Sequence, residues 1–139
     1  MKKAVVIYQS KTGITKKFAE AISAYAAGKG IEVETLSIAE YSGGIAEKAD
    51  YVFLGCWTAG FLLFFLQHPD TPWKQFAAGL PALPGKVALF TTYKVATGSM
   101  FNSMKKHLRL NPEQPVVELR SRNGSISEEH KIALDAFLK

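Results

Sequence analysis

Three hydroxyl side chains and one glycine lie close together near the start of the chain, in the segment at 10–15. Ser10, Thr12 and Thr15 can donate O–H hydrogen bonds to the oxygens of an anion, and Gly13 lets the main chain approach that anion closely. Three hydroxyls are more than one helix cap needs, although an ordinary capped turn is the alternative interpretation. The chemistry that this spacing favours is the binding of a phosphate group.

The flanking residues predict the elements that hold this segment. The apolar run at 4–8 predicts a buried strand, and Ile14, Phe18, Ile22 and Tyr25 recur at the spacing of one helix face. A strand that turns directly into a helix presents backbone N–H groups and the positive end of the helix dipole at the turn. The backbone at this turn is therefore predicted to favour a phosphate, as the hydroxyl side chains do.

Strand and helix patterns alternate through the rest of the chain. Further strands are predicted at 31–36, 51–55, 86–91 and 115–119, and helical segments are predicted between them and after the last strand. Three of the strands are nearly continuous apolar runs, which predicts a parallel sheet buried on both faces. With right-handed crossovers this is a doubly wound, three-layer α/β sandwich. Because no linker or repeat is visible, residues 1–139 are expected to form one domain.

Local signals also predict how individual helices begin. Thr71 is expected to be the N-cap of a helix with Pro72 at its first position. Gly98 and Ser99 are expected to open the following helix. Ser125 and Glu128 have the spacing of a capping box for the last helix. The residues expected on the inward face of that last helix are Ile132, Ala133, Ala136 and Phe137.

The order Ser-x-Thr-Gly-x-Thr after the first strand resembles the FMN phosphate loop of the flavodoxin family. It is neither a Walker P-loop nor a dinucleotide motif, because it lacks a final Gly-Lys-Ser/Thr and has only one glycine. The order and length of the elements resemble the short form of the family over nearly the whole chain. The resemblance implies a five-stranded parallel sheet of order 2-1-3-4-5, whose switch point lies between the first and third strands. It also implies FMN as the cofactor.

The resemblance implies that three loops, after the first, third and fourth strands, hold the FMN. Trp57 and Tyr93 would supply flat rings that stack on the flavin, and small neighbouring residues would leave the backbone accessible. The cofactor carries the electrons, so no catalytic residue of the protein is expected. The cofactor-binding residues expected on this basis are Ser10, Lys11, Thr12, Gly13, Ile14, Thr15, Cys56, Trp57, Thr58, Ala59, Gly60, Thr92, Tyr93, Lys94, Thr97 and Gly98.

Two departures from the family pattern bear on function. Many flavodoxins have Asn at the position of Ile14, so one polar contact to the phosphate loop is lost. Flavodoxins are typically acidic near the flavin, whereas the third loop here carries Lys94 and neither ring-binding loop has a carboxylate. Positive charge stabilises an anionic reduced flavin, so the lower-potential couple is predicted to be less strongly reducing than is usual in the family.

Other residues that could do chemistry are not assigned a role. Cys56 has no partner cysteine, and His68, His107 and His130 lack metal-ligand spacing, so neither a disulfide nor a metal site is expected. The run of six large apolar residues that begins at Phe61 and ends at Leu66 is unusual in a connection. It is interpreted either as a segment that covers the core or as an apolar docking lip beside the flavin.

Composition narrows the class of protein. The 139 residues are 47% hydrophobic, with 17 basic and 12 acidic side chains and a net charge of +5. The basic residues are scattered and no nucleic-acid motif accompanies them, so nucleic acid is not expected as a partner. No apolar run approaches the about 20 residues that span a bilayer. With one cysteine and no signal peptide, a cytoplasmic location is expected.

The leading functional hypothesis is an FMN-binding electron carrier that works between a reductase and an acceptor enzyme. Its basic surface suggests redox partners with acidic docking faces. Two alternatives remain open at this point. The protein could be a flavin-dependent NAD(P)H reductase of a small acceptor such as a quinone, or a binding module that keeps the fold and has lost FMN.

Overall fold

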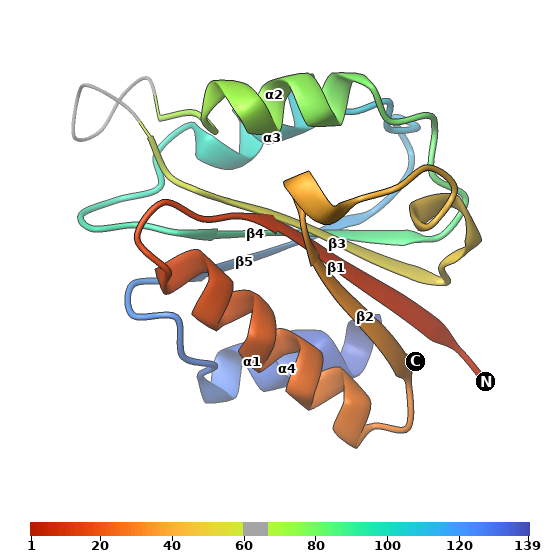
Figure 1. Ribbon diagram of the computed structural model, residues 1–139. Helices are drawn as coiled ribbons and strands as arrows, with labels where there is room; N and C mark the ends of the chain where they lie inside the picture. Colours follow the sequence, from red (N-terminus) through yellow and green to blue (C-terminus); the bar gives the residue numbers. More distant parts are fainter. Residues whose placement is uncertain (60–66) are drawn as a thin grey trace.

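Five parallel strands form the centre of the molecule (Figure 1). The computed structural model describes residues 1–59 and 67–139, and its strands pair in the order β2-β1-β3-β4-β5. The doubly wound architecture and the strand order expected from the sequence are both confirmed. The strands are β1 (Lys3–Gln9), β2 (Glu32–Ser37), β3 (Tyr51–Trp57), β4 (Lys86–Thr92) and β5 (Val116–Ser121).

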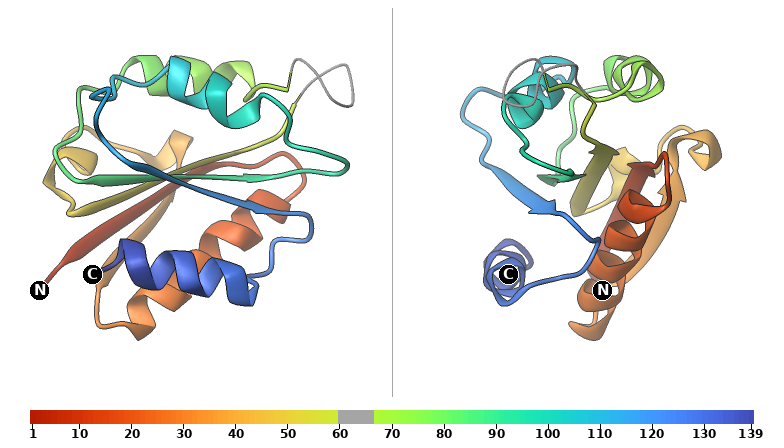
Figure 2. Two further views of the ribbon diagram at one scale, coloured as in Figure 1. Left: turned by 180° about the vertical axis from the view of Figure 1, so that it is seen from behind. Right: turned by 90° about the vertical axis from the view of Figure 1, so that its left-hand side faces the viewer.

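Helices cover both faces of the sheet, as the two further views in Figure 2 show. One face carries α1 (Ile14–Gly28) and α4 (Glu128–Phe137), and the other carries α2 (Thr71–Ala78) and α3 (Met100–Lys106). Two short 3-10 turns, η1 (Ile38–Glu40) and η2 (Ala46–Lys48), connect β2 to β3. The long Ser37–Asp50 connection therefore contains only short helical turns, as its two adjacent glycines predict.

The core lies in two layers, one on each side of the sheet. On the side of α1 and α4, Phe18 and Leu134 pack with Phe90 of the sheet. On the side of α2 and α3, Trp73 and Met104 pack against the opposite face of the strands. All these side chains are buried because β3 and β4 lie between two helical layers. This explains why the central strands are apolar along their whole length rather than at every second residue.

The caps of two helices differ from those predicted. The N-cap of α2 is Asp70 rather than Thr71, because the Asp70 carboxylate accepts the backbone N–H of Trp73 at 3.0 Å. Pro72 is then the second helical residue. In α4 the capping pair is Ser127 and His130 rather than Ser125 and Glu128, since the Ser127 hydroxyl accepts the His130 N–H and the His130 ring accepts the Ser127 N–H.

The inward face of α4 is also corrected by the structure. Leu134 and Phe137 are buried against the sheet, whereas Ile132 is 71% exposed and Ala136 is also exposed. Leu134 and Phe137 are three residues apart and share the helix face that packs on the sheet, whereas Ile132 lies on another face. Phe137 was predicted correctly because it is one turn further along the same buried stripe.

The sequence predicted no membrane-spanning segment and singled out an apolar run at 61–66. Among the described residues, none of the helices has both the length and the apolar character needed to cross a bilayer. The apolar run at 61–66, interpreted from sequence as a cover for the core or a docking lip, lies outside the described residues. Gly60, expected to bind the cofactor, lies outside them too.

Candidate functional site

A cavity of about 370 Å³ opens at the carboxyl ends of β1, β3 and β4. This is the edge of the sheet where the strand order reverses and where ligands of doubly wound folds bind. Eight residues expected from sequence line it: Lys11, Thr12, Ile14, Trp57, Thr58, Thr92, Tyr93 and Lys94. The lining also includes four residues that sequence reasoning did not select: Gln67, Val95, Ala96 and Arg122.

The loop after β1 is held by its own serine. The Ser10 hydroxyl oxygen accepts the N–H groups of Gly13 at 3.0 Å and Lys16 at 3.3 Å. Gly13 has a φ of 95°, a left-handed conformation that disfavours a side chain. Ser10 therefore builds the turn, and the structure gives it a supporting place behind the loop.

Three backbone N–H groups at the start of α1 remain free to bind an anion. The N–H groups of Thr12, Ile14 and Thr15 donate to no acceptor among residues 1–59 and 67–139. Unsatisfied N–H groups in the first turn of a helix, at the positive end of its dipole, are suited to a phosphate. The backbone here fits an anion independently of any side chain.

Thr15 lies below the loop rather than in the cavity wall. Its side chain is buried, and its hydroxyl shares a hydrogen bond of 2.6 Å with the hydroxyl of Thr92 on β4. The hydroxyl expected to bind a phosphate therefore joins α1 to β4 in this structure. Thr12 does line the cavity.

The loop after β3 contributes an indole ring that is held from both sides. The Trp57 Nε1–H donates to the Asp70 carboxylate at 2.9 Å, and the Lys11 ammonium lies 4.7 Å from the centre of the ring. Thr58 is joined to β4 through its N–H, which donates to the Thr92 carbonyl at 2.9 Å. Ala59 pairs with His68 and does not line the cavity.

Cys56 is directed away from the cavity, into the core between the sheet and α2. Burial raises the pKa of its thiol far above the ordinary value, so the thiolate is disfavoured. Its carbonyl oxygen accepts the Thr91 hydroxyl at 2.6 Å. The structure therefore gives Cys56 a packing role and no reactive thiol.

The loop after β4 supplies Tyr93 and Lys94, and the loop after β5 adds Arg122. The Arg122 guanidinium lies 5.5 Å from the centre of the Tyr93 ring and donates to the Val95 carbonyl at 3.5 Å. Arg122 was missed because it was placed in a polar loop. Its position directly after the last strand was the available signal, since the carboxyl ends of parallel strands meet at one edge.

Thr97 and Gly98 lie outside the cavity lining. Thr97 is buried, and its hydroxyl accepts the Arg120 guanidinium at 3.2 Å. Gly98 lies at the approach to α3 with a φ of 49°. These two residues therefore support the loop after β4 and do not form the wall of the cavity.

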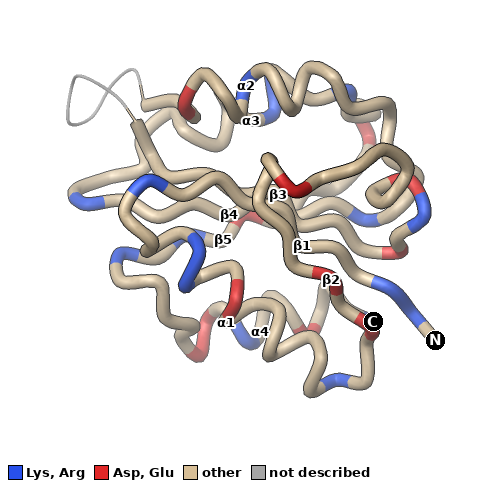
Figure 3. Tube along the Cα trace, in the orientation of Figure 1, with Lys and Arg blue, Asp and Glu red and all other residues tan. Residues whose placement is uncertain are grey.

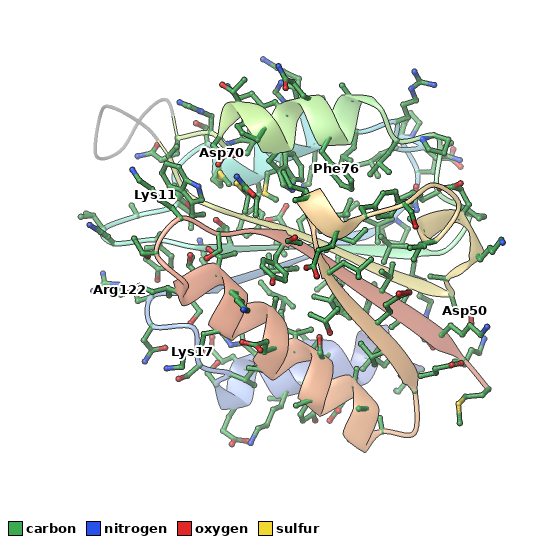
Figure 4. All side chains as sticks on the ribbon, viewed as in Figure 1. Lys11, Lys17, Asp50, Asp70, Phe76 and Arg122 are labelled. Atoms are coloured by element: carbon green, nitrogen blue, oxygen red, sulfur yellow. The ribbon has the colours of Figure 1, made fainter. Side chains whose placement is uncertain are left out.

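The cavity combines positive charge with exposed apolar surface. Lys11, Lys94 and Arg122 are among its lining residues, whereas no carboxylate of residues 1–59 and 67–139 is. Figure 3 shows Lys and Arg along the loops at this end of the molecule, and Figure 4 shows Lys11 and Arg122 on the same side. Ile14 is 38% exposed and Val95 is 47% exposed at the same site. The arrangement is suited to a ligand with an anionic group and a flat apolar ring.

A metal centre is not indicated by the described part of the chain. No group of three or more His, Cys, Asp or Glu side chains there has the arrangement of a metal site. The three histidines have separate local contacts: His68 with the Pro69 carbonyl, His107 with the Ser103 carbonyl and His130 with the Arg120 carbonyl.

Solved structures with the same fold include several flavodoxins. The two-electron reduced flavodoxin of Megasphaera elsdenii is 20% identical, with a TM-score of 0.70 over 97% of this chain and 98% of that one. The flavodoxin of Streptococcus pneumoniae is 16% identical, with a TM-score of 0.67 over 98% of this chain and 94% of that one. The rubredoxin oxygen:oxidoreductase of Desulfovibrio gigas is 14% identical, with a TM-score of 0.62 over 98% of this chain and 34% of that one.

Sequence comparison places the chain in a family. The sequence model of the flavodoxin domain matches residues 5–107, which include the loops after β1, β3 and β4. The match therefore covers the strands and loops that form most of the cavity. The chain belongs to the flavodoxin domain family.

Proposed function

We propose that this protein binds FMN in the cavity at the carboxyl ends of β1, β3 and β4 and carries electrons between a reductase and an acceptor enzyme. The flavodoxin family consists of FMN-binding electron-transfer domains. The observation that carries the proposal is the convergence of three loops on one cavity. Free N–H groups lie at the loop after β1, and an aromatic ring comes from each of the other two.

The residues present fit the two chemically different parts of FMN. The free N–H groups of Thr12, Ile14 and Thr15 and the ammonium of Lys11 are suited to the phosphate. The rings of Trp57 and Tyr93 offer stacking surfaces for the isoalloxazine. The expected residues that line the cavity would contact the FMN directly, Ser10, Gly13 and Thr15 would support the phosphate loop, and Thr97 and Gly98 would support the loop after β4. Bound FMN would supply the electron chemistry, and the protein would position it.

The partners that this site favours are proteins with acidic docking faces. Lys11, Lys94 and Arg122 line the cavity, and no carboxylate does so in the part of the chain that the structure describes. A positive rim attracts a negatively charged surface and speeds its encounter with the flavin. Redox partners, a reductase and an acceptor, would then dock over the same end of the sheet.

The first test is a visible absorption spectrum of the purified protein, recorded before and after excess FMN is added and removed by desalting. Retained flavin bands with a shifted envelope are the expected result. A protein that stays colourless after this treatment would contradict the proposal and support a binding module that has lost FMN. Steady NAD(P)H oxidation by the loaded protein without a reductase would instead favour a self-sufficient reductase.

A further inference from the structure

We infer that Asp70 is a positioning residue that fixes the Trp57 indole in the cavity wall and thereby strengthens FMN binding. The inference rests on the proposed FMN-binding function. Asp70 does not line the cavity, and sequence reasoning gave it no role. It acts through Trp57, which does line it.

The Asp70 carboxylate joins three elements at this end of the sheet. One oxygen, Oδ2, accepts Trp57 Nε1–H at 2.9 Å and Gln9 Nε2–H at 3.0 Å. The other, Oδ1, accepts the backbone N–H of Trp73 at 3.0 Å and thereby caps α2, and it also accepts the Cys56 thiol at 3.7 Å. Gln9 is the last residue of β1 and directly precedes Ser10. Asp70 therefore links the phosphate loop, the ring-bearing loop and α2.

Capping alone does not explain the contacts of Oδ2. An N-cap needs one acceptor oxygen, and Oδ1 already meets that need. The indole N–H of Trp73 is buried and has no partner in the described part of the chain. The bond of the Trp57 N–H to a carboxylate therefore calls for an explanation beyond the capping of α2.

The explanation is that the Asp70 carboxylate fixes the orientation of the Trp57 ring and increases the electron density of its face. A hydrogen bond to a charged acceptor is stronger than a neutral one, so it restricts the two torsions of the side chain more firmly. The carboxylate at the ring edge also polarises the indole and makes its face more attractive to a cation. Lys11 lies over that face, 4.7 Å from the ring centre. A ring held in this way is prepared for stacking before the ligand arrives.

The test uses Asp70→Asn, which separates the two functions of the carboxylate. Asn is a good N-cap and keeps one acceptor oxygen for the Trp73 N–H, whereas its amide nitrogen cannot accept from Trp57 or Gln9. Asp70→Ser, a second variant, also caps and removes the second oxygen altogether. Asp50→Asn is the matched control, because Asp50 accepts the Lys3 N–H at 2.9 Å at the opposite end of the sheet (Figure 4).

The first readout needs no flavin. In ¹⁵N–¹H spectra of the FMN-free protein, the indole resonance that Trp57→Phe removes is expected to shift and to exchange faster with solvent in Asp70→Asn. The Trp73 indole resonance should stay in place, and Asp50→Asn should move neither. An unchanged Trp57 resonance in both Asp70 variants would overturn the inference.

The second readout is the Kd for FMN in a double-mutant cycle. Asp70→Asn is expected to raise Kd about tenfold in the wild-type background and less than about twofold when Trp57 is already Phe. An equal loss in both backgrounds would overturn the inference, because Asp70 would then act without Trp57. If the wild-type protein binds no FMN, the proposed function fails, and the flavin part of this inference fails with it. A wild-type protein that binds FMN while the cycle shows no coupling refutes the inference alone.

Discussion

At the scale of single residues, the cavity is marked by three basic side chains, Lys11, Lys94 and Arg122. Their positive charge bears on the redox potential of a bound flavin. The reduced flavin of an electron carrier can bear a negative charge, and a nearby cation stabilises that charge. Lys94 is exposed, so water screens its effect. Each cation therefore contributes modestly to the potential, and their effects have the same sign.

Replacing a cation should lower the potential of the bound flavin. We expect Lys94→Gln and Arg122→Gln each to shift the lower-potential couple by about 20–40 mV in the negative direction, the effect of a partly screened unit charge. A dye-coupled redox titration of each variant measures this shift. Lys48→Gln, on η2 away from the cavity, is the control and should leave the couple in place. A positive or zero shift in both cavity variants would contradict the electrostatic account.

At the scale of elements, the turn from β1 into α1 is the part with the strictest backbone requirement. Gly13, with a φ of 95°, precedes the first helical residue, and a Cβ there would have no atom within 4 Å. Any cost of a side chain at this position is therefore conformational rather than a clash. Gly28, at the other end of the same helix, also has open space around its position and is helical.

These two glycines provide a matched pair of substitutions within α1. Gly13→Ala is expected to lower the free energy of unfolding by about 1 kcal/mol, because alanine is strained in the left-handed region. Gly28→Ala is expected to raise it by about 0.5 kcal/mol, because alanine restricts the unfolded chain and fits the helix. Urea unfolding of both proteins measures the difference. Equal effects would show that the turn does not demand the left-handed conformation.

At the scale of the whole molecule, the two ends of the sheet differ in charge. Basic residues from the loops after β1, β4 and β5 gather at the cavity end, whereas the opposite end mixes both signs (Figure 3). Three of the 17 basic side chains, Lys11, Lys94 and Arg122, therefore lie where a redox partner would approach the flavin. Long-range attraction of this kind is screened by salt.

Electron transfer to a partner with an acidic docking face should accordingly slow as salt is added. The Debye length falls from about 10 Å at 0.1 M to about 3 Å at 1 M, so the second-order rate is expected to fall steadily over that range. Stopped-flow reduction of an acidic acceptor protein measures it. Lys94→Glu should flatten the salt dependence, whereas Lys2→Glu, next to the start of β1, should not. A rate independent of salt in the wild type would exclude charge steering.

Much of the fold could be predicted because its signals are local. The apolar runs at 4–8, 51–55 and 86–91 became the central strands, since burial on both faces demands apolar side chains at every position. The hydroxyls and glycine at 10–15 predicted a sharp turn from strand to helix, and Gly13 lies directly before the first residue of α1. The resemblance to flavodoxins supplied the strand order, which periodicity alone could not.

The errors arose where a local signal had more than one solution. Thr71 and Ser125 both suit an N-cap, but Asp70 and Ser127 take that role because their side chains reach the N–H three residues later. Along α4 the apolar residues do not mark a single face, and packing against the sheet buried Leu134 and Phe137 and left Ile132 exposed.

The sequence by itself determined the alternation of strands and helices, and it predicted that Thr12, Trp57 and Tyr93 lie together at one site. Only the tertiary structure decided which side chains support them. Thr15 bonds to Thr92, 77 positions away, and Arg122 covers Tyr93 from the loop after another strand. Asp70 bonds to Gln9, 61 positions away, and to Trp57, 13 positions away. Periodicity and turn chemistry act between neighbours along the chain, whereas these contacts exist only because parallel strands bring their carboxyl ends to one edge.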